Sequence, residues 1–290
     1  MPSKVSISQV SARAYFSYMS APCTEIRQTM GILSRGSMYE FKNIDIIFVL
    51  MVLILAPLIS LLFQAPFLLS IFLFYVSLSI YFSFRTPKAI KKSLAISFVS
   101  IPICLFLDYM AFYNNAWAVS TIFPFRVLGL VPLEDFICLF FVVYGLTIIR
   151  QHFFETFHGV NYQRYRIFWV ATILVTSLFL FIRALHPNYL KIPYYYFWLL
   201  IIVFILPTTI GLIKFKKFRR IIPRMLPFFF IGMISWELVA LYLGQWTFPS
   251  LEYVGFVKFL GIRWPIEEFL VWQVLALPAI LVIAEFGVGK

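Results

Sequence analysis

Long apolar runs alternate with short polar or basic links along most of the chain. A helix needs about 20 mostly apolar residues to cross a hydrocarbon core of roughly 30 Å, and runs of this length indicate helices rather than strands. The pattern predicts eight membrane-spanning helices, at 44–63, 66–84, 93–113, 132–149, 167–185, 194–214, 222–243 and 265–286. Only Gln64-Ala65-Pro66 separates the first two, so a re-entrant pair is the alternative there. We expect an all-α integral membrane protein.

Composition and charge agree with a membrane location. Hydrophobic residues make up 62% of the chain and charged residues only 12%, far from ordinary soluble usage. With the N-terminus inside, 19 of the 24 Lys and Arg fall on inner segments. The five on outer segments are Arg126, Arg183, Lys191, Lys258 and Arg263. The positive-inside rule therefore predicts that both termini are cytoplasmic, in the cell (inner) membrane.

The net charge of +12 comes largely from basic runs that connect the predicted spans, such as "RTPKAIKK" and "KFKKFRR". In such places Lys and Arg fix topology and contact anionic membrane lipid, so we expect a lipid partner and no nucleic acid. We also expect no metal and no cofactor. The three cysteines are scattered, the histidines fall in connecting segments, and neither a GxGxxG nor a P-loop pattern occurs.

Residues 1–42 differ from the rest, because they are basic and Ser-rich without a continuous apolar core. They do not have the pattern of a secretory signal. Two alternatives remain: a disordered or targeting-like extension, or a mis-assigned start that precedes a true start at Met38.

Two segments of the chain match each other in register. Each has an acid, an alanine three residues on, a tyrosine five on and a tryptophan nine on, followed by a glycine and Pro-x-Glu-acid-Phe. The first copy contains Asp108, Ala111, Tyr113, Trp117, Gly129, Glu134, Asp135 and Phe136; the second contains Glu237, Ala240, Tyr242, Trp246, Gly261, Glu267, Glu268 and Phe269. The intervening loop differs by four residues. We therefore predict two tandem four-helix repeats, 43–150 and 151–290, in parallel orientation.

The six acids of these copies are half of the twelve Asp and Glu in the chain. The topology places all of them toward the outer half of the bilayer, where carboxylates are costly and usually functional. An ordinary helix start, with proline first and acids in the first turn, is the alternative explanation for each pair. It does not require the upstream acids, Asp108 and Glu237. Neighbouring helical residues project about 100° apart, so one acid of a pair can face a cavity while the other caps or pairs.

Carboxyls that approach each other in a dry site share a proton, and the neutral member is a potential acid. Such chemistry suits an apolar substrate that must be protonated, for example a polyene. At these residues the chain resembles the flavin-independent membrane lycopene cyclases. "GQWTFP" and "WPIEEF" are the most similar stretches, and "NNAWAV" with "VPLEDF" is a looser copy.

The resemblance implies proton-initiated cyclisation of the ψ-end groups of lycopene or a related linear carotenoid, without net redox change. The catalytic candidates are then Glu134, Asp135, Glu267 and Glu268, with Asp108 and Glu237 as second acids. Because aromatic faces stabilise a cation in a dry site, the substrate-binding candidates are Trp117, Trp246, Tyr113, Tyr242, Phe136 and Phe269. The substrate would be the partner, with a homo-oligomer or an assembly with other carotenoid enzymes also compatible.

The chain departs from the family where an aromatic residue usually follows three positions after the second acid. Cys138 and Val271 stand there, although Trp272 is adjacent to the latter. Two other classes of protein stay open. Buried carboxylates in a repeat also occur in a proton-coupled carrier of a lipophilic molecule. A purely structural membrane subunit is the third alternative, and it leaves the paired acids unexplained.

Overall fold

The computed structural model describes residues 23–154 and 161–288, and side chains within 43–154 and 161–287. The chain divides into two compact units, Met1–Leu50 and Met51–Lys290. The boundary between the units falls inside helix α2 (Cys23–Leu62). Of the smaller unit, the structure describes only residues 23–50, which form the first part of this helix. This helix begins well before the apolar run that predicted it, because residues 23–42 contain many good helix formers and no proline. The predicted extension at 1–22 lies outside the described residues.

Seven helices of the described chain are long and apolar enough to cross a membrane. They are Asn43–Leu62, Phe67–Arg85, Pro87–Tyr113, Tyr162–Leu185, Tyr195–Lys214, Phe218–Tyr242 and Ile266–Gly287. The first two are separate helices, divided by a turn at Gln64 with a φ of 46°. A helix also lies where the remaining span was predicted, α6 (Leu133–Phe153), but it is not among these seven. An all-α membrane protein is therefore supported, and the count of eight spans is not confirmed.

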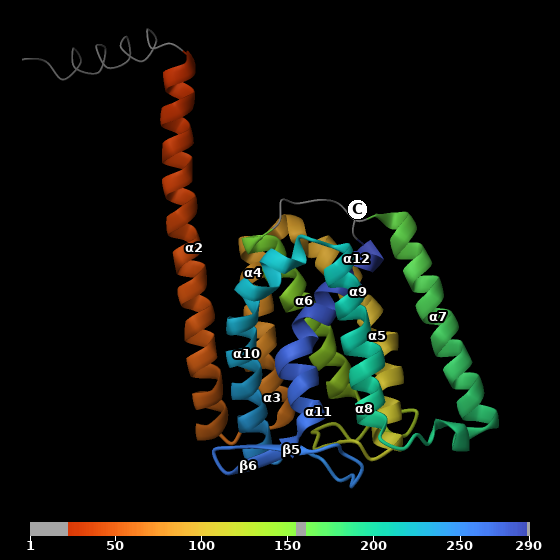
Figure 1. Ribbon diagram of the computed structural model, residues 1–290. Helices are drawn as coiled ribbons and strands as arrows, with labels where there is room; N and C mark the ends of the chain where they lie inside the picture. The colour runs from red at the N-terminus through yellow and green to blue at the C-terminus, as the bar shows by residue number, and fades with distance from the viewer. Residues whose placement is uncertain (1–22, 155–160, 289–290) are drawn as a thin grey trace, which may run out of the picture. The chain divides into compact units, whose positions relative to one another are not determined.

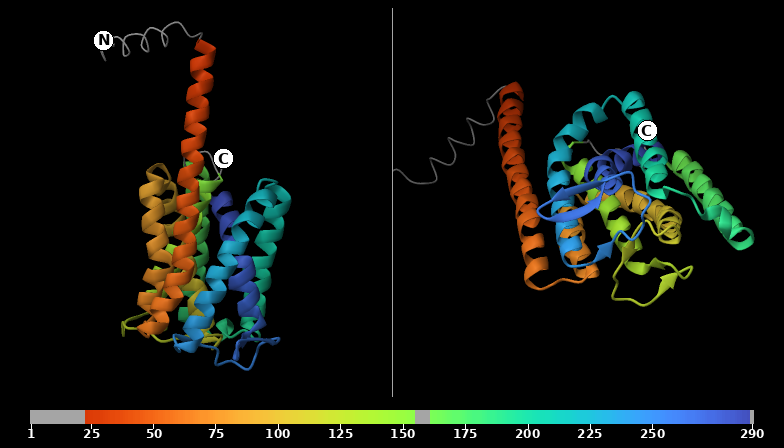
Figure 2. Two further views of the ribbon diagram at one scale, coloured as in Figure 1. Left: turned by 90° about the vertical axis from the view of Figure 1, so that its left-hand side faces the viewer. Right: turned by 60° about the horizontal axis from the view of Figure 1, so that its bottom comes forward.

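The unit formed by residues 51–290 is a helical bundle with two central helices. Besides α6, its longer helices include α5 (Ile90–Tyr113), α7 (Tyr162–Leu185), α10 (Phe218–Tyr242) and α12 (Ala276–Val288), and the two central helices are α6 and α12. Helix α6 packs against α5 and α12, and α12 also contacts α7 and α10. Figures 1 and 2 show α6 and α12 inside the ring of other helices. The central position of α12 agrees with the burial of 56% of the most apolar 18-residue stretch of the 266–287 span, the largest such share among the seven spans.

Three of the spans contain a π-helical segment but remain continuous helices. The first comprises α3 (Phe67–Ile71), η1 (Phe72–Val76) and α4 (Ser77–Arg85); the second comprises α8 (Tyr195–Leu199), η4 (Leu200–Ile205) and α9 (Leu206–Lys214); the third comprises α11 (Ile266–Glu268), η5 (Phe269–Leu275) and α12. Short 3₁₀ turns, η2 (Pro87–Ala89) and η3 (Pro187–Leu190), precede α5 and α8. Segments of π-helix recur at functional sites. The third segment, η5, directly follows Glu268 and is therefore of interest for the site.

Two hairpins lead into the helices that begin with the acid pairs, although the sequence pattern predicted no strands. Strands β2 (Arg126–Val127) and β3 (Val131–Pro132) precede α6, and β5 (Phe256–Phe259) and β6 (Ile262–Pro265) precede α11. Both turns have two consecutive residues with positive φ, a leucine followed by a glycine. The φ values are 54° and 82° at Leu128 and Gly129, and 50° and 84° at Leu260 and Gly261. Glycine stands at the larger of these angles in both turns because it has no Cβ to clash.

A third pairing joins the two matching segments of the chain. Strand β1 (Ala118–Val119) pairs antiparallel with β4 (Trp246–Thr247), so that Ala118 lies opposite Thr247. Each of these residues stands ten positions after its upstream acid. Equivalent residues of the two copies therefore face each other. The helices that precede these strands also end alike, with Asn115 and Gly244 at φ values of 53° and 65°.

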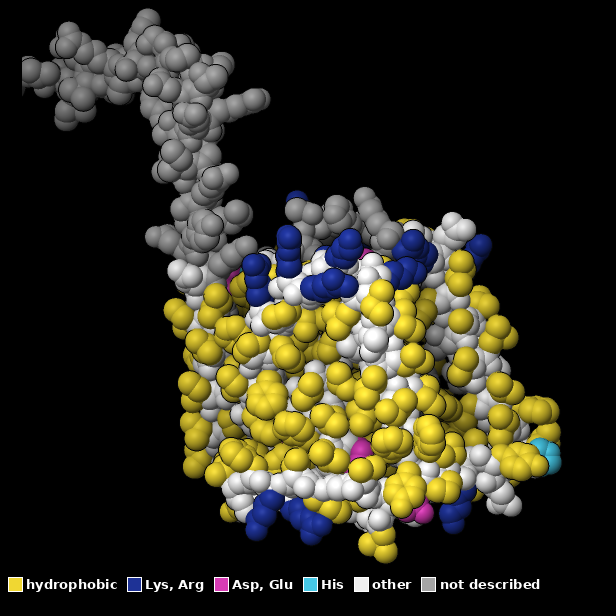
Figure 3. All heavy atoms as spheres, in the orientation of Figure 1, with side chains coloured by type: hydrophobic (Ala, Val, Ile, Leu, Met, Phe, Trp, Pro, Cys, Tyr) yellow, Lys and Arg dark blue, Asp and Glu magenta, His cyan; other side chains and the backbone are white. Residues whose placement is uncertain are grey.

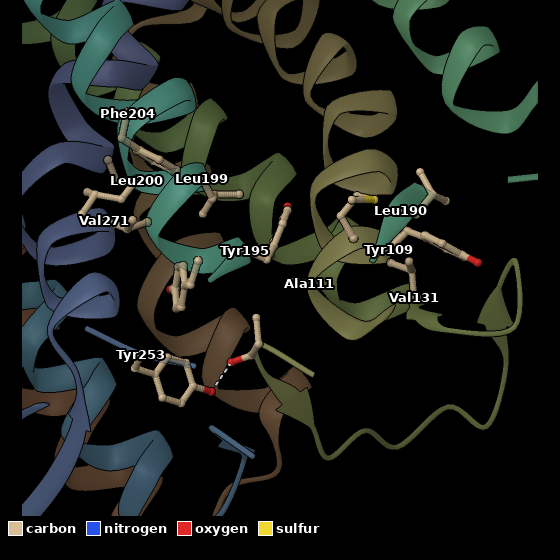
Figure 4. Close-up of a cluster of buried hydrophobic side chains, with 14 of the residues drawn as sticks. Tyr109, Ala111, Val131, Leu190, Tyr195, Leu199, Leu200, Phe204, Tyr253 and Val271 are labelled. Atoms are coloured by element: carbon tan, nitrogen blue, oxygen red, sulfur yellow. Dashed lines mark hydrogen bonds between the residues drawn. The ribbon is translucent and has the colours of Figure 1, made fainter. Parts of the chain in front are cut away.

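Buried aromatic and aliphatic side chains pack next to these loops (Figure 4). Tyr109, Leu190, Tyr195 and Val271 contribute from four different elements. Tyr253 lies among them and its hydroxyl donates a hydrogen bond of 2.7 Å to the carbonyl of Ala116. Burial raises the pKa of Tyr253 to about 12, so the hydroxyl stays protonated at neutral pH. The cluster thereby ties the loop after β4 to the end of α5.

The face drawn in Figure 3 has a broad apolar belt, with Lys and Arg gathered along its two edges and most densely along the upper one. Large apolar side chains such as Phe84, Leu174 and Ile213 are more than half exposed, at 81%, 64% and 67%. A soluble protein would not leave so much apolar surface in contact with water. This surface is that of an integral membrane protein.

Candidate active site

The first acid of each pair holds the loop that precedes its helix. Glu134 is fully buried, and its Oε1 accepts hydrogen bonds of 2.9 Å from the amides of Ile122 and Phe123. Glu267 is 1% exposed, and its Oε1 accepts a hydrogen bond of 2.6 Å from the amide of Val254. Neither carboxylate caps its own helix, whose N-cap residue is a proline without a side-chain hydrogen bond. Each of these two acids thus satisfies loop amides through its Oε1.

The second acid of each pair lies elsewhere. Asp135 and Glu268 both line a large cavity in the bundle, together with the upstream acids Asp108 and Glu237. The two members of each pair therefore differ in position, as the angle of about 100° between neighbouring helical residues requires. Residues that are far apart in the sequence bring four carboxyl groups to one cavity.

The upstream acids come from helices α5 and α10, close to the C-terminal ends of those helices. Asp108 accepts a hydrogen bond of 2.8 Å from the thiol of Cys104, one turn earlier on α5. Glu237 accepts one of 3.1 Å from the indole nitrogen of Trp246, and its other oxygen lies 3.5 Å from the side-chain amide of Gln273. The two acids thus occupy equivalent places in the chain but have different partners.

The cavity is long and mostly apolar, and its four acids come from the helix ends next to the loops. It has about 1500 Å³ of space between its walls, part of it open to the surroundings. Its lining runs along α5 from Asp108 back to Ile96, and along the last span from Glu268 to Gly287. At a rise of 1.5 Å per residue these distances are about 18 Å and about 28 Å. The described lining contains no Lys, Arg or His, so the acids face an otherwise apolar channel.

Tryptophans are concentrated in the lining near the acids. Trp117 and Trp246, which the sequence singled out, both line the cavity. Trp236 and Trp272 line it as well, so the cavity takes four of the seven tryptophans of the chain. The sequence contained a signal for these two additional tryptophans. Trp236 adjoins Glu237, and Trp272 stands one helical turn after Glu268.

The other four aromatic candidates do not belong to the lining of this cavity. Tyr113 and Phe136 pack against the buried aromatic cluster near the loops. The ring of Phe269 packs against Phe230, and Tyr242 is 73% exposed. Matching positions in a repeat therefore did not suffice to place an aromatic ring in the cavity, because neighbouring helical positions face different directions.

Sequence analysis also missed two polar groups that contact the upstream acids. Cys104 precedes Asp108 by four residues, and Gln273 follows Glu268 by five. Gln273 is fully buried in the π segment η5. An isolated glutamine inside an apolar span is a usable signal, since an unsatisfied amide is costly in a membrane.

No group of three or more His, Cys, Asp or Glu that could hold a metal ion occurs among the described residues. Comparison with protein-family models, with curated proteins and with solved structures finds no match for this chain.

Proposed function

We propose that this protein cyclises the ψ-end groups of a linear carotenoid such as lycopene, by protonation and without net redox change. The observation that carries the proposal is one apolar cavity that brings together four carboxyl groups, Asp108, Asp135, Glu237 and Glu268, at one end. A hydrocarbon polyene can be recognised only by shape and by apolar contact, and its alkene can be activated only by a strong or well-placed acid. The cavity supplies both properties.

The proposed reaction has three steps. A carboxyl proton adds to the terminal double bond, and the neighbouring alkene attacks the resulting cation to close the ring. A carboxylate then removes a proton next to the cationic carbon and fixes the ring double bond. The product is an isomer of the substrate, so the chemistry needs proton transfer and no electron carrier. The sites for both transfers would be the cavity acids, since general acids and bases act at hydrogen-bond reach.

The four tryptophans of the lining support the same proposal. The ring face of tryptophan attracts a cation, and the attraction is strongest where water is excluded. Trp117 directly precedes strand β1 and Trp246 lies in its partner strand β4, while Trp236 adjoins an acid. A carbocation formed beside the acids would lie between aromatic faces instead of water, which would otherwise trap it as an alcohol.

The pairing of Ala118 with Thr247 supports the two-copy organisation of 43–150 and 151–290. An axis that relates two copies must pass between equivalent residues, and these two residues are equivalent. On this proposal each copy contributes one upstream acid and one cavity-facing acid to a shared site, and the active unit is the whole bundle.

The test is expression of the full chain in a lycopene-accumulating host, with chromatographic analysis of the pigments. We expect cyclised carotene with the wild type and strongly reduced product with Asp135→Asn or Glu268→Gln. Glu252→Gln is the matched control, since Glu252 is an exposed carboxylate that lies outside the cavity and its replacement retains an acceptor oxygen. Unchanged lycopene beside well-expressed wild-type protein would contradict the proposal.

A proton-coupled carrier of a lipophilic molecule is the second candidate. The length of the cavity favours it, because the lining extends over most of the last span. Carriers commonly bind at the unwound breaks of discontinuous helices, whereas the three π segments here remain within continuous helices. Transfer of unchanged lycopene between vesicle populations, dependent on a proton gradient, would identify the carrier.

A further inference from the structure

Glu237 occupies an unusual position for a carboxylate. It is 2% exposed and lies in the membrane span of α10. Its Oε1 accepts the Trp246 indole N–H, and its Oε2 faces the Gln273 side-chain amide at 3.5 Å. An ionised carboxylate in such a place needs strong donors on both oxygens. Whether the second oxygen has a donor depends on the orientation of one amide group.

The surroundings of Gln273 decide that orientation. One end of its amide lies 3.0 Å from the carbonyl oxygen of Glu268 and 2.9 Å from that of Phe269. Both of these are acceptors, so the amide nitrogen belongs at this end, where it donates to both. The opposite orientation gives Glu237 a donor at 3.5 Å but sets an amide oxygen against two carbonyl oxygens. We adopt the first, because two short hydrogen bonds outweigh one long one.

With that orientation the amide oxygen of Gln273 faces Oε2 of Glu237. Two oxygens that face each other in a buried site form a favourable contact only when one carries a hydrogen. Gln273 has no hydrogen on its oxygen, so the hydrogen belongs to Glu237. The glutamine thus connects the protonated carboxyl to the main chain of Glu268 at the start of the π segment.

The first copy lacks this arrangement. The position that matches Gln273, five residues after the second acid, is Phe140. The residue that matches Cys104, four before the upstream acid, is Met233. Asp108 accepts a hydrogen bond from the Cys104 thiol. The two upstream acids therefore have different partners, and only Glu237 has an amide side chain facing its second oxygen.

We propose that Glu237 is held in its protonated form as a hydrogen-bond donor to Gln273, and that it is the acid that delivers the proton to the alkene. The delivery step rests on the proposed cyclisation. In that step the O–H bond of Glu237 breaks and a C–H bond forms at the terminal alkene carbon. After ring closure a C–H bond next to the cation breaks, and a cavity carboxylate accepts that proton. Gln273 is a positioning residue that keeps the proton on Oε2.

Infrared spectroscopy of the full chain in lipid nanodiscs tests the protonation directly, through the carbonyl stretch of a buried protonated carboxyl. We expect this band in the wild type, its loss in Glu237→Gln, and its persistence in Asp108→Asn. Gln273→Leu removes the acceptor, so the band should persist but move to higher frequency. Phe140→Leu is the matched control and leaves the band in place. Glu237→Asp retains a carboxyl and should retain a protonated-carboxyl band, which separates loss of the acid from loss of folding. Each variant must also elute as a monodisperse protein.

Pigment analysis of the same variants tests delivery. General acid catalysis is worth about 10²–10⁴-fold, so Glu237→Gln should lose at least about 100-fold of the cyclised product. A carbonyl region that is identical in wild type and Glu237→Gln overturns the inference, even if the wild type cyclises lycopene. If the band behaves as expected but the wild type forms no cyclised product, the protonated Glu237 stands and the delivery step fails together with the proposed function.

Discussion

At the residue scale, adjacent carboxyls have separate tasks because a helix turns by about 100° per residue. Glu134 and Glu267 satisfy amides of the preceding loops, and Asp135 and Glu268 face the cavity. Capping of the following helix therefore does not account for either member of a pair. The division also gives each member a distinct mutational signature.

The first prediction concerns Glu134 and its neighbour. Glu134→Ala removes the acceptor of two loop amides and leaves both unpaired, so we expect it to lower the free energy of unfolding by about 1–3 kcal/mol. Asp135→Asn keeps the volume and replaces only a cavity carboxyl by an amide, so stability should change by less while product formation falls. Thermal unfolding in detergent, together with pigment analysis, measures both effects.

Glu134→Gln is the control, since its amide oxygen can still accept from the two loop amides and should retain most of the stability. If Glu134→Ala unfolds at the wild-type temperature but abolishes product, the assignment of Glu134 to the loop is wrong. Equal loss of stability in Glu134→Ala and Asp135→Asn would equally contradict the division of the pair.

The second prediction concerns the aromatic lining. Trp272→Leu removes a ring from the cavity near Glu268 and keeps an apolar side chain there. A cation–π contact in a dry site is worth about 1–2 kcal/mol, which corresponds to a rate roughly 5–30-fold lower. Trp198→Leu is the control, because Trp198 is 48% exposed and does not line the cavity. Initial rates of cyclisation in membranes compare the two variants. Equal rates would contradict the prediction that the Trp272 ring stabilises the cation.

At the element scale, the sequence predicted most of the helices because each needs a long apolar run. The hairpins could not be predicted in the same way. Strand β2 has two residues and β5 has four, which is too short for a period-two pattern. The glycines of the repeat were the available signal, since Gly129 and Gly261 stand in the two turns at φ values of 82° and 84°. Their common spacing in the sequence reflects a backbone conformation.

The third prediction follows from that conformation. Gly261→Ala meets no atom within 4 Å of the new Cβ, so its whole cost is the positive φ of 84°. We expect a loss of about 1–2 kcal/mol in the free energy of unfolding. Gly255→Ala, in the same loop region, has ordinary van der Waals contact at 3.9 Å and no positive φ, so it should cost little. Denaturant titration in micelles compares them, and equal midpoints would show that the turn adapts to a side chain.

At the scale of the whole bundle, the sequence identified the acids but not their common cavity. Their equivalence could be recognised from spacing, because both copies use the same local structures at the ends of α5 and α10. Which carboxyl faces the cavity depends on helix rotation, and that rotation is set by packing between distant elements. Arg150 and Glu285, for example, form an ion pair between α6 and α12 with side chains 4% and 7% exposed. No local pattern in the chain indicates that contact.

The length of the cavity leads to the last prediction. Ala284 lines the channel at the opposite end from the acids, about 24 Å along the span from Glu268 at 1.5 Å per residue. Ala284→Phe would fill this end without touching the carboxyls. If the channel holds the polyene tail while one ψ-end meets the acids, cyclisation of full-length lycopene should fall several-fold, and a shorter analogue with the same ψ-end should be cyclised at the wild-type rate. Ala171→Phe on the exposed face of α7 is the control for the added ring. Equal loss of rate for both substrates would mean that the substitution disturbs the acids. No loss for either substrate would place the tail outside the channel. The comparison separates these cases because a channel narrowed at that depth discriminates only against a chain long enough to reach it.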